Sequence, residues 1–409
     1  MGTSACKKAQ VSVDDAEEIV SPTMGTRNQF TLDSIFLYAK QVYLWNEALP
    51  GYAEFNPRQK YVGIGSDITT FRKELFDISQ LKINVATGSP YELPVYFENP
   101  KYSNLQLGRS IPGSTAGIGQ PDTAVLTSKV INNGNTLVAY LALGSFPSLN
   151  SSKAALNQAF AEFAVSNPKV IIIDLRSNGG GYLETAEYVA DLIVSSSLNG
   201  KVMYSEVFNP AMQNGIVPIL KHQPYLDANG KTAVYNGRSA TMADVDYTIA
   251  GNTYKFSKKG NLQSIQSVYF IVSGNTASAS EMLISALKPY FDVKLIGEKT
   301  YGKPVGFFGI NIDQYSVYLS SFLIKNANGW SDYFTGMQPD VMIKGADNPV
   351  LGDPDELCLN AALSLINGTR TLTANKMATT GKIANVKADI LQINNVESVM
   401  LENRLRLRK

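Results

Sequence analysis

The sequence lacks a strong net charge and long apolar runs. Its 36 basic and 35 acidic side chains leave a net charge of +1 and a pI near 7.6, so no long-range field attracts nucleic acid or an anionic surface. It contains no run of about 18 apolar residues, so we expect no membrane-spanning helix. With 44% apolar residues among 409, the chain is instead long enough for two or three globular domains.

Cysteine is also scarce, since Cys6 and Cys358 are the only two. Two thiols are too few for a disulfide framework or a thiolate zinc site. Cys358 lies in the apolar pattern LCLNAALSLI and is expected to be buried. Cys6 follows TSA in a polar leader and resembles the acylated cysteine of a bacterial lipoprotein. This interpretation predicts an exported protein, either periplasmic or tethered to a membrane of a bacterial envelope.

The lipoprotein interpretation carries a condition. No apolar export signal precedes Cys6, so the interpretation implies that such a signal was removed and that Met1 and Gly2 were added in front of the remaining chain. The alternative is that the cysteine is incidental.

Changes in composition divide the chain into segments. From Thr31, a candidate N-cap, an apolar stripe at helical spacing extends to about Trp45 and predicts a small helical domain. The expected segments are a flexible leader at 1–28, the helical N-terminal domain at 29–60, a loop-rich segment at 61–123, a core at 124–370 with a β-rich insertion at 201–265, and a C-terminal tail at 371–409.

The core has the pattern of an α/β fold. An Asn-Asn-Gly-Asn turn at 132–135 joins two strand candidates into a hairpin. Continuous apolar, β-branched runs then alternate with amphipathic helices, which is typical of buried parallel strands. The predicted strands are 124–131, 136–143, 169–175, 267–273 and 293–297, and the predicted helices are 152–165, 182–194 and 279–288. We therefore predict a mainly parallel α/β sheet.

Two of these strands end in chemically unusual stretches, and α/β sheets bind ligands where parallel strands end. Strand 169–175 is followed by three glycines at 179–181, which let the backbone approach a ligand and present free N–H groups. Strand 267–273 is followed by GNTASASE, in which Ser278 can expose a nucleophilic hydroxyl beside the N–H of Ala279. The alternatives are a glycine turn that serves packing alone and a serine that only caps a helix.

A hydroxyl nucleophile needs a base, and two kinds are available. The single histidine, His222, lies in the irregular insertion and is better explained as a surface residue than as part of a Ser-His-Asp triad. A lysine acts as a base when it is neutral, which burial among apolar groups favours. Lys303 has glycines and aromatic residues around it and no acid within four residues, whereas Lys294 and Lys299 lie in more polar stretches. An ordinary surface lysine is the alternative for Lys303.

Together these stretches resemble the carboxyl-terminal processing and tail-specific serine proteases, the Ser-Lys peptidases of the S41, tricorn-like type. The resemblance covers about 30–60 and 124–366. It rests on DLRSNGGG (174–181), GNTASASE (274–281) with TYGK (300–303), GMQPD (336–340) and LGDPDE (351–356). It implies a core of the ClpP/crotonase-like type.

Carried over by position, the resemblance implies that Ser278 is the nucleophile and Lys303 the general base. The N–H groups of Ala279 and of a glycine in the 179–181 turn, foremost Gly180, would form the oxyanion hole. The implied reaction is hydrolysis of a peptide or unfolded protein through an acyl-enzyme, with no cofactor and no metal. Ser280 and Glu281 match as well, Glu281 as a structural acid at the helix start.

Two features depart from the family pattern. Many relatives orient the lysine with a nearby glutamine, and that position is Gly306 here. Relatives also carry a PDZ domain that captures a substrate's carboxyl terminus by strand addition. Residues 61–123 show neither its apolar carboxylate-binding loop nor its paired strands, so we expect the PDZ domain to be absent or degenerate. Recognition of a free C-terminus and the oligomeric state both stay open.

Two other functions fit parts of the sequence. Ser285 and Lys288 form an S-x-x-K match like that of penicillin-binding proteins, but the companion SDN and KTG motifs are absent. A non-catalytic peptide-binding protein would keep the cleft without turnover, in line with the missing glutamine and PDZ domain. The basic end RLRLRK is expected to be solvated.

Overall fold

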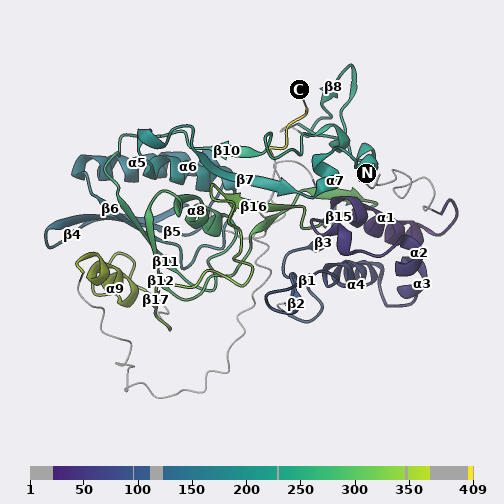
Figure 1. Ribbon diagram of the computed structural model, residues 1–409, viewed down its shortest axis with the longest axis horizontal. Helices are drawn as coiled ribbons and strands as arrows, with labels where there is room; N and C mark the ends of the chain where they lie inside the picture. Colours follow the sequence, from purple (N-terminus) through teal and green to yellow (C-terminus); the bar gives the residue numbers. More distant parts are fainter. Residues whose placement is uncertain are drawn as a thin grey trace, which may run out of the picture.

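A six-stranded sheet forms the centre of the computed structural model, which describes residues 22–94, 96–110, 123–227, 230–345, 349–368 and 404–408. Its strand order is β17-β12-β11-β6-β5-β4 (Figure 1). The strands are β4 (Val125–Asn133), β5 (Thr136–Leu143), β6 (Val170–Asp174), β11 (Ser267–Val272), β12 (Asp292–Gly297) and β17 (Val341–Met342). Every neighbouring pair is parallel except the β4–β5 hairpin, which confirms the predicted α/β core.

Helices cover both faces of this sheet, and the strands are apolar on both sides for that reason. Ile173 packs in the same cluster as side chains of α6 (Leu183–Ile193) and α8 (Ala279–Leu287). Its neighbour Ile172 packs on the other side with Cys358 and Leu359 of α9 (Leu357–Ile366). The expected burial of Cys358 is confirmed. A further helix, α5 (Leu149–Ser166), contacts α6 and the hairpin.

The N-terminal helices lie at one end of the molecule, beyond the sheet (Figure 1). They are α1 (Arg27–Val42), α2 (Tyr52–Phe55), α3 (Pro57–Lys60) and α4 (Asp67–Ser79). The prediction of Thr31 as the N-cap is wrong, because α1 begins one turn earlier. Thr26 is the N-cap, and it exchanges hydrogen bonds with Gln29 in a capping box.

The segment expected to be loop-rich packs closely on the rest of the protein. It contributes α4 and three short strands, β1 (Ile83–Asn84), β2 (Ser89–Pro90) and β3 (Asn104–Leu107). Strand β3 pairs with β15 (Tyr315–Tyr318), which pairs with β14 (Gly309–Ile312). The fully buried carboxylate of Glu92 accepts hydrogen bonds from Tyr43 Oη, Ser103 Oγ and Ser320 Oγ. One side chain therefore ties this segment to α1 and to the turn after β15.

The insertion at 201–265 contributes two strands to the sheet that contains the segment after Lys303. It contains β7 (Val202–Phe208), β8 (Val234–Tyr235), β9 (Arg238–Ser239) and β10 (Thr253–Lys255), with the short helices α7 (Pro210–Gln213), η4 (Pro218–His222) and η5 (Met242–Asp244). Strand β7 belongs to a second sheet of order β10-β7-β16-β13. The other members of that sheet, β16 (Phe322–Asn326) and β13 (Val305–Gly306), come from the core, and β13 begins two residues after Lys303.

The end of the chain at 404–408 packs on the insertion, contrary to the expectation of a solvated end. Leu405 is buried, Leu407 forms a β-bridge with Val245, and Arg404 pairs with Glu187 at 2.7 Å. The apolar residues that alternate with the arginines explain the difference, since they give this short stretch one face to bury. Cys6 and most of the expected tail, at 369–403, lie outside the described residues. No described helix is both long and apolar enough to cross a bilayer.

Candidate active site

The glycine turn after β6 and the serine turn after β11 meet at the carboxyl edge of the sheet, because these two parallel strands are neighbours. Hydroxyl groups join the two turns. Thr276 Oγ1 donates to the carbonyl of Leu175 at 2.8 Å, and Ser280 Oγ donates to the carbonyl of Asn178 at 3.1 Å. The small polar residues of TASAS thus bind backbone carbonyl groups of the turn after β6.

Ser278 has a backbone conformation that side-chain-bearing residues rarely adopt. Its φ and ψ are 61° and −119°, at the turn from strand to helix. The residue is fully buried, and its Oγ makes no hydrogen bond within the described part of the chain. A buried hydroxyl without a partner costs about 1–3 kcal/mol. The structure therefore holds Ser278 in a strained turn and leaves its hydroxyl unused.

The glycine turn approaches Ser278 so closely that one position accepts glycine alone. A Cβ atom on Gly180 would lie 2.8 Å from Ser278 Cβ and 2.9 Å from the carbonyl oxygen of Ala277, and φ at Gly180 is +110°. Gly181 is required for another reason, because its Cβ would lie 2.2 Å from the carbonyl oxygen of Phe146. One glycine thus permits approach to the serine, and the next permits packing against the loop after β5.

The two predicted oxyanion donors, the N–H groups of Ala279 and Gly180, have different hydrogen-bonding surroundings in this structure. Ala279 is the first residue of α8, where backbone N–H groups have no acceptor within the helix. The N–H of Gly180 instead donates to Asn178 Oδ1 at 2.9 Å. The other half of that carboxamide, Asn178 Nδ2, is buried and has no partner among the described residues. Gly180 can bind an oxyanion only after its N–H leaves Asn178.

Glu281 connects the serine turn to the lysine loop. Its Oε1 accepts hydrogen bonds from Thr300 Oγ1 at 2.5 Å and from the N–H of Gly302 at 2.7 Å. Its Oε2 accepts from the N–H groups of Ser278 and Lys303. Burial raises the pKa of this carboxyl, and the hydrogen bonds oppose that rise. The acid predicted to support the helix start therefore also anchors the lysine loop.

Lys303 is buried among apolar groups, as its sequence context predicts. Its exposed fraction is 5%, and its Nζ lies 4.7 Å from the centre of the Phe307 ring. The buried cluster around this loop contains Tyr102, Val305, Phe307 and Tyr318. Because Ser278 Oγ makes no hydrogen bond among the described residues, the two side chains are not joined by one here.

Gly306, the position at which the sequence resemblance implies a glutamine, is closely packed. Gly306 lies in β13, and a Cβ atom there would be 2.3 Å from Cζ of Phe322 on the neighbouring strand. The Phe322 ring fills the space that a longer side chain would need. A lysine partner at this position is therefore sterically excluded.

Other candidate groups are placed less favourably. His222 is exposed at the end of η4, an element bound to α1 through the N–H of Ile219 and Gln41 Oε1 at 3.1 Å. Ser285 lies buried within α8, whereas Lys288 is exposed and its Nζ lies 5.0 Å from the centre of the Trp330 ring. Within the described ranges, no cluster of three or more His, Cys, Asp or Glu side chains could hold a metal ion.

Two residues of the N-terminal segment that were not predicted from the sequence support the lysine loop. Tyr102 Oη donates to the carbonyl of Gly302 at 2.7 Å, and Lys101 Nζ donates to the carbonyl of Tyr301 at 2.9 Å. These partners are 200 residues apart in the chain. No local pattern near Lys101 or Tyr102 indicates such contacts.

The chain is similar to a known protein family and to several solved structures. The family model of Peptidase family S41 matches residues 137–343, about half of the chain, and no curated protein sequence matches. One similar solved structure is a candidate S41 protease from Bacteroides fragilis NCTC 9343, with 23% identity, a TM-score of 0.44 and coverage of 61% of this chain and 59% of that one.

Two further solved structures cover more of the chain. The photosystem II D1 C-terminal processing protease shares 16% identity at a TM-score of 0.47, over 82% of this chain and 97% of that one. A lipoprotein from Streptococcus agalactiae shares 13% identity at a TM-score of 0.45, over 86% and 100%. By the extent of its match to the family model, the chain belongs to peptidase family S41.

Proposed function

We propose that the protein is a serine peptidase that cleaves peptides or unfolded proteins through an acyl-enzyme on Ser278, with Lys303 as the general base. The observation that carries the proposal is the unused hydroxyl of Ser278, which is held in a strained turn against Gly180. Functional sites are where such strain and unpaired buried groups concentrate. Family membership supports peptide hydrolysis as the reaction.

The proposed reaction needs a neutral Lys303. Ser278 Oγ attacks the carbonyl carbon of the scissile bond while Lys303 Nζ takes the hydroxyl proton. The negative charge on the carbonyl oxygen is stabilised by the N–H groups of Ala279 and Gly180. Lys303 then gives its proton to the leaving amine, the C–N bond breaks, and the acyl group stays on Ser278. A water molecule, deprotonated by Lys303, releases the acyl group as a carboxylic acid and regenerates the serine.

Two local changes must precede this reaction. Ser278 is fully buried, so substrate binding has to uncover it, and Gly180 must exchange Asn178 Oδ1 for the substrate oxygen. Catalytic hydrogen bonds are often long or unmade in the free enzyme and tighten when the substrate complex forms. The structure therefore corresponds to a resting state of the proposed enzyme.

A fluorophosphonate probe tests the proposal directly. The wild-type protein should be labelled at Ser278, as identified by mass spectrometry of the modified peptide, and should hydrolyse an unfolded protein such as casein. Ser278→Ala should abolish labelling and hydrolysis, and the matched control Ser285→Ala should keep both. Labelling at Ser285 would favour the S-x-x-K alternative. Absence of both labelling and hydrolysis would favour a non-catalytic peptide-binding protein.

We also propose that the protein is exported and tethered by an acyl chain on Cys6. The proposal rests on the residues TSAC in a polar leader, which lie outside the described residues. Its check is the coding sequence immediately upstream of this stretch. An apolar segment of about 7–15 residues after a basic start is expected there. A polar upstream sequence would contradict the tether.

A further inference from the structure

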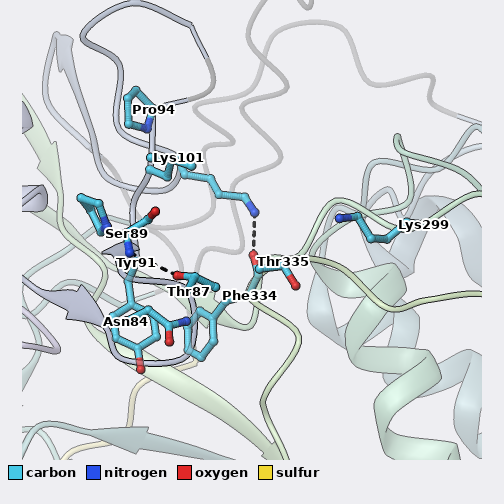
Figure 2. A pocket seen from close by; sticks show the side chains of 11 residues that line it. Asn84, Thr87, Ser89, Tyr91, Pro94, Lys101, Lys299, Phe334 and Thr335 are labelled. Atoms are coloured by element: carbon cyan, nitrogen blue, oxygen red, sulfur yellow. Dashed lines mark hydrogen bonds between the residues drawn. The ribbon is translucent and has the colours of Figure 1, made fainter.

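A cavity of about 320 Å³ lies between the N-terminal segment and the loop that leads to Lys303. Its walls come from residues 84–101 on one side and from Lys299, Phe334 and Thr335 on the other. Figure 2 shows Lys101 and Lys299 extending into this space from opposite sides, with Thr335 between their ammonium groups. The lining includes these two lysines and no aspartate or glutamate.

Lys101 is held so that its charge faces the cavity. Its Nζ donates to the carbonyl oxygens of Tyr301 at 2.9 Å and Phe334 at 2.6 Å. An ammonium group has three N–H donors, so one is left for a ligand. Burial lowers the pKa of Lys101 to about 8; the negative charge of Glu281 opposes this shift, and the positive charge of Lys299 adds to it. An anion between the two lysines would counter the effects of burial and of Lys299.

The rest of the lining combines an apolar wall with the polar side chains of Asn84, Thr87, Ser89 and Thr335. Tyr91 stacks on Trp45 with ring centres 4.7 Å apart and meets Phe334 edge-on at 4.6 Å. Pro90, Leu93 and Pro94 complete this wall. The cavity therefore suits an anionic group attached to apolar structure, as in a peptide, better than a small hydrated ion.

The cavity is connected to both proposed catalytic residues through one short loop. Tyr301, whose carbonyl accepts from Lys101, lies two residues before Lys303. The N–H of Tyr301 donates to the carbonyl of Thr276 at 3.0 Å, and Thr276 lies two residues before Ser278. A peptide that contacts Lys101 would thus lie against the segment that carries the proposed base.

We propose that this cavity is a substrate subsite that binds a carboxylate of the peptide between Lys101 and Lys299. The carboxylate is an acidic side chain or the free C-terminus, and the two share the same chemistry. This inference rests on the proposed peptidase function, since it assigns the cavity to the substrate of that site. It also gives residues 61–123 a role in specificity.

Matched peptides test the subsite. Four fluorogenic peptides of one sequence carry aspartate or asparagine near the scissile bond and a free or amidated C-terminus. Wild-type protein should favour a carboxylate form by about tenfold in kcat/KM, as for a charge-assisted hydrogen bond. Comparison of the aspartate with the asparagine peptide, and of the free with the amidated C-terminus, shows whether the bound carboxylate is the side chain or the C-terminus. Equal kcat/KM for all four peptides overturns the inference.

Substitutions of the two lining lysines test whether the preference for a carboxylate peptide arises in the cavity. Lys299→Met, at an exposed side chain, should remove most of it, and Lys299→Glu should reverse it in favour of a peptide with lysine in place of aspartate. The control Lys288→Met, at an exposed lysine beside Trp330, should leave it unchanged. Lys101→Met is the stronger test where the variant folds, since this lysine also supports the loop. A preference that survives both Lys299→Met and Lys299→Glu overturns the inference.

The subsite can fail separately from the peptidase. If the fluorophosphonate still labels Ser278 while the four peptides are cleaved equally, the peptidase stands and the subsite is wrong. If no peptide is cleaved, the same peptides are titrated against Ser278→Ala by fluorescence anisotropy. Tighter binding of a carboxylate form, lost in Ser278→Ala combined with Lys299→Glu, supports the subsite without turnover. Equal binding of all four peptides overturns it.

Discussion

Ser278 and Lys303 donate their backbone N–H groups to the same oxygen atom, Oε2 of Glu281, at 3.1 and 2.7 Å. The carboxylate lies in the first turn of α8, where the partial positive charge of the helix end favours an anion. Two loops that lie 25 residues apart in the chain therefore share one buried acceptor. Movement of either loop is transmitted to the other through this side chain.

The first prediction concerns the Glu281→Gln variant. An amide replaces one acceptor oxygen by an NH₂ donor. In one orientation this NH₂ group faces the N–H groups of Ser278 and Lys303, and in the other it faces the N–H of Gly302 and the hydroxyl of Thr300. We expect the free energy of unfolding to fall by about 1–3 kcal/mol and kcat/KM to fall further, because both loops shift. Urea denaturation and peptide hydrolysis measure the two effects. Glu298→Gln, whose carboxylate accepts from the N–H of Gly345 at 3.2 Å, is the control and should change little. Wild-type activity in Glu281→Gln would contradict the coupling.

A second prediction follows from the strain at Ser278. Ser278→Ala removes the unpaired buried hydroxyl and should raise the free energy of unfolding by about 1 kcal/mol. Ser278→Gly should be at least as stable as Ser278→Ala, because relief of about 1–3 kcal/mol of backbone strain offsets the greater entropy of glycine in the unfolded chain. Both variants should be inactive.

The control for the strain is Ser285 in the interior of α8, whose buried hydroxyl has no partner among the described residues. There Ser285→Gly should be less stable than Ser285→Ala by about 1 kcal/mol, since no strain is relieved. Thermal or urea unfolding of the alanine and glycine variants at Ser278 and Ser285 gives the difference in unfolding free energy between the two substitutions at each position. If the glycine variant is less stable than the alanine variant by the same amount at both positions, the backbone of Ser278 is not strained.

Much of the core was predictable because its signals are local. Continuous apolar runs and amphipathic helices predicted β6, β11, β12 and their helices to within a few residues. Both unusual strand exits were recognised from the sequence, because α/β sheets bind ligands where parallel strands end. That the two strands are neighbours is shown by the structure. The burial of Lys303 also followed from its immediate sequence, where glycines and aromatic residues surround the lysine.

The unpredicted features are contacts between distant segments. Lys101 and Tyr102 reach the lysine loop across 200 residues, and nothing in their own neighbourhood indicates that partner. The start of α1 was misplaced because the candidate N-cap was chosen from the apolar stripe, while the capping pair Thr26 and Gln29 precedes it. The hydrogen bond from Gly180 to Asn178 depends on the conformation of one loop, which spacing does not reveal.

A third prediction concerns the missing glutamine. Gly306→Gln should not restore a partner for Lys303, because the Phe322 ring occupies the place of its Cβ. We expect a loss of unfolding free energy of about 1–3 kcal/mol from overpacking, with lower activity. In the paired variant Gly306→Gln with Phe322→Ala, the space is opened and stability should partly recover. Stability and activity of Gly306→Gln at or above wild type would show that the steric explanation is wrong.

A fourth prediction addresses the oxyanion hole. Asn178→Ala removes the acceptor that holds the N–H of Gly180, so this donor no longer has to leave a partner when substrate binds. We expect stability to fall by about 1 kcal/mol, while affinity for a peptide aldehyde, which forms a tetrahedral adduct with serine, is kept or improved. A loss of more than tenfold in that affinity would show that Asn178 itself is needed to stabilise the adduct.

The final prediction is that kcat and KM both rise with pH, with opposite effects on kcat/KM. If Lys303 is the base, kcat should rise with pH, because the neutral amine becomes more populated. Lys101 binds a carboxylate only while charged, and burial lowers its pKa to about 8, so KM for a carboxylate peptide should rise above about pH 8. The groups around Lys101 are Lys299, Glu281 and the rings of Tyr102 and Tyr301. Burial raises the pKa of Tyr301 to about 12 and that of Tyr102 well above its usual value, so neither phenol titrates in this range.

Linkage makes the size of that KM effect depend on the ligand. A bound carboxylate raises the pKa of Lys101, so the free enzyme loses the charge first as pH rises and the complex is then disfavoured. The amide peptide lacks this interaction, and its KM should stay flat between about pH 7 and 9.5. Lys299→Met should reduce the KM increase, whereas the rise in kcat should persist, because that rise belongs to Lys303. If KM does not change with pH for any of the peptides, Lys101 does not bind the substrate carboxylate. If kcat does not change with pH, Lys303 is not the general base.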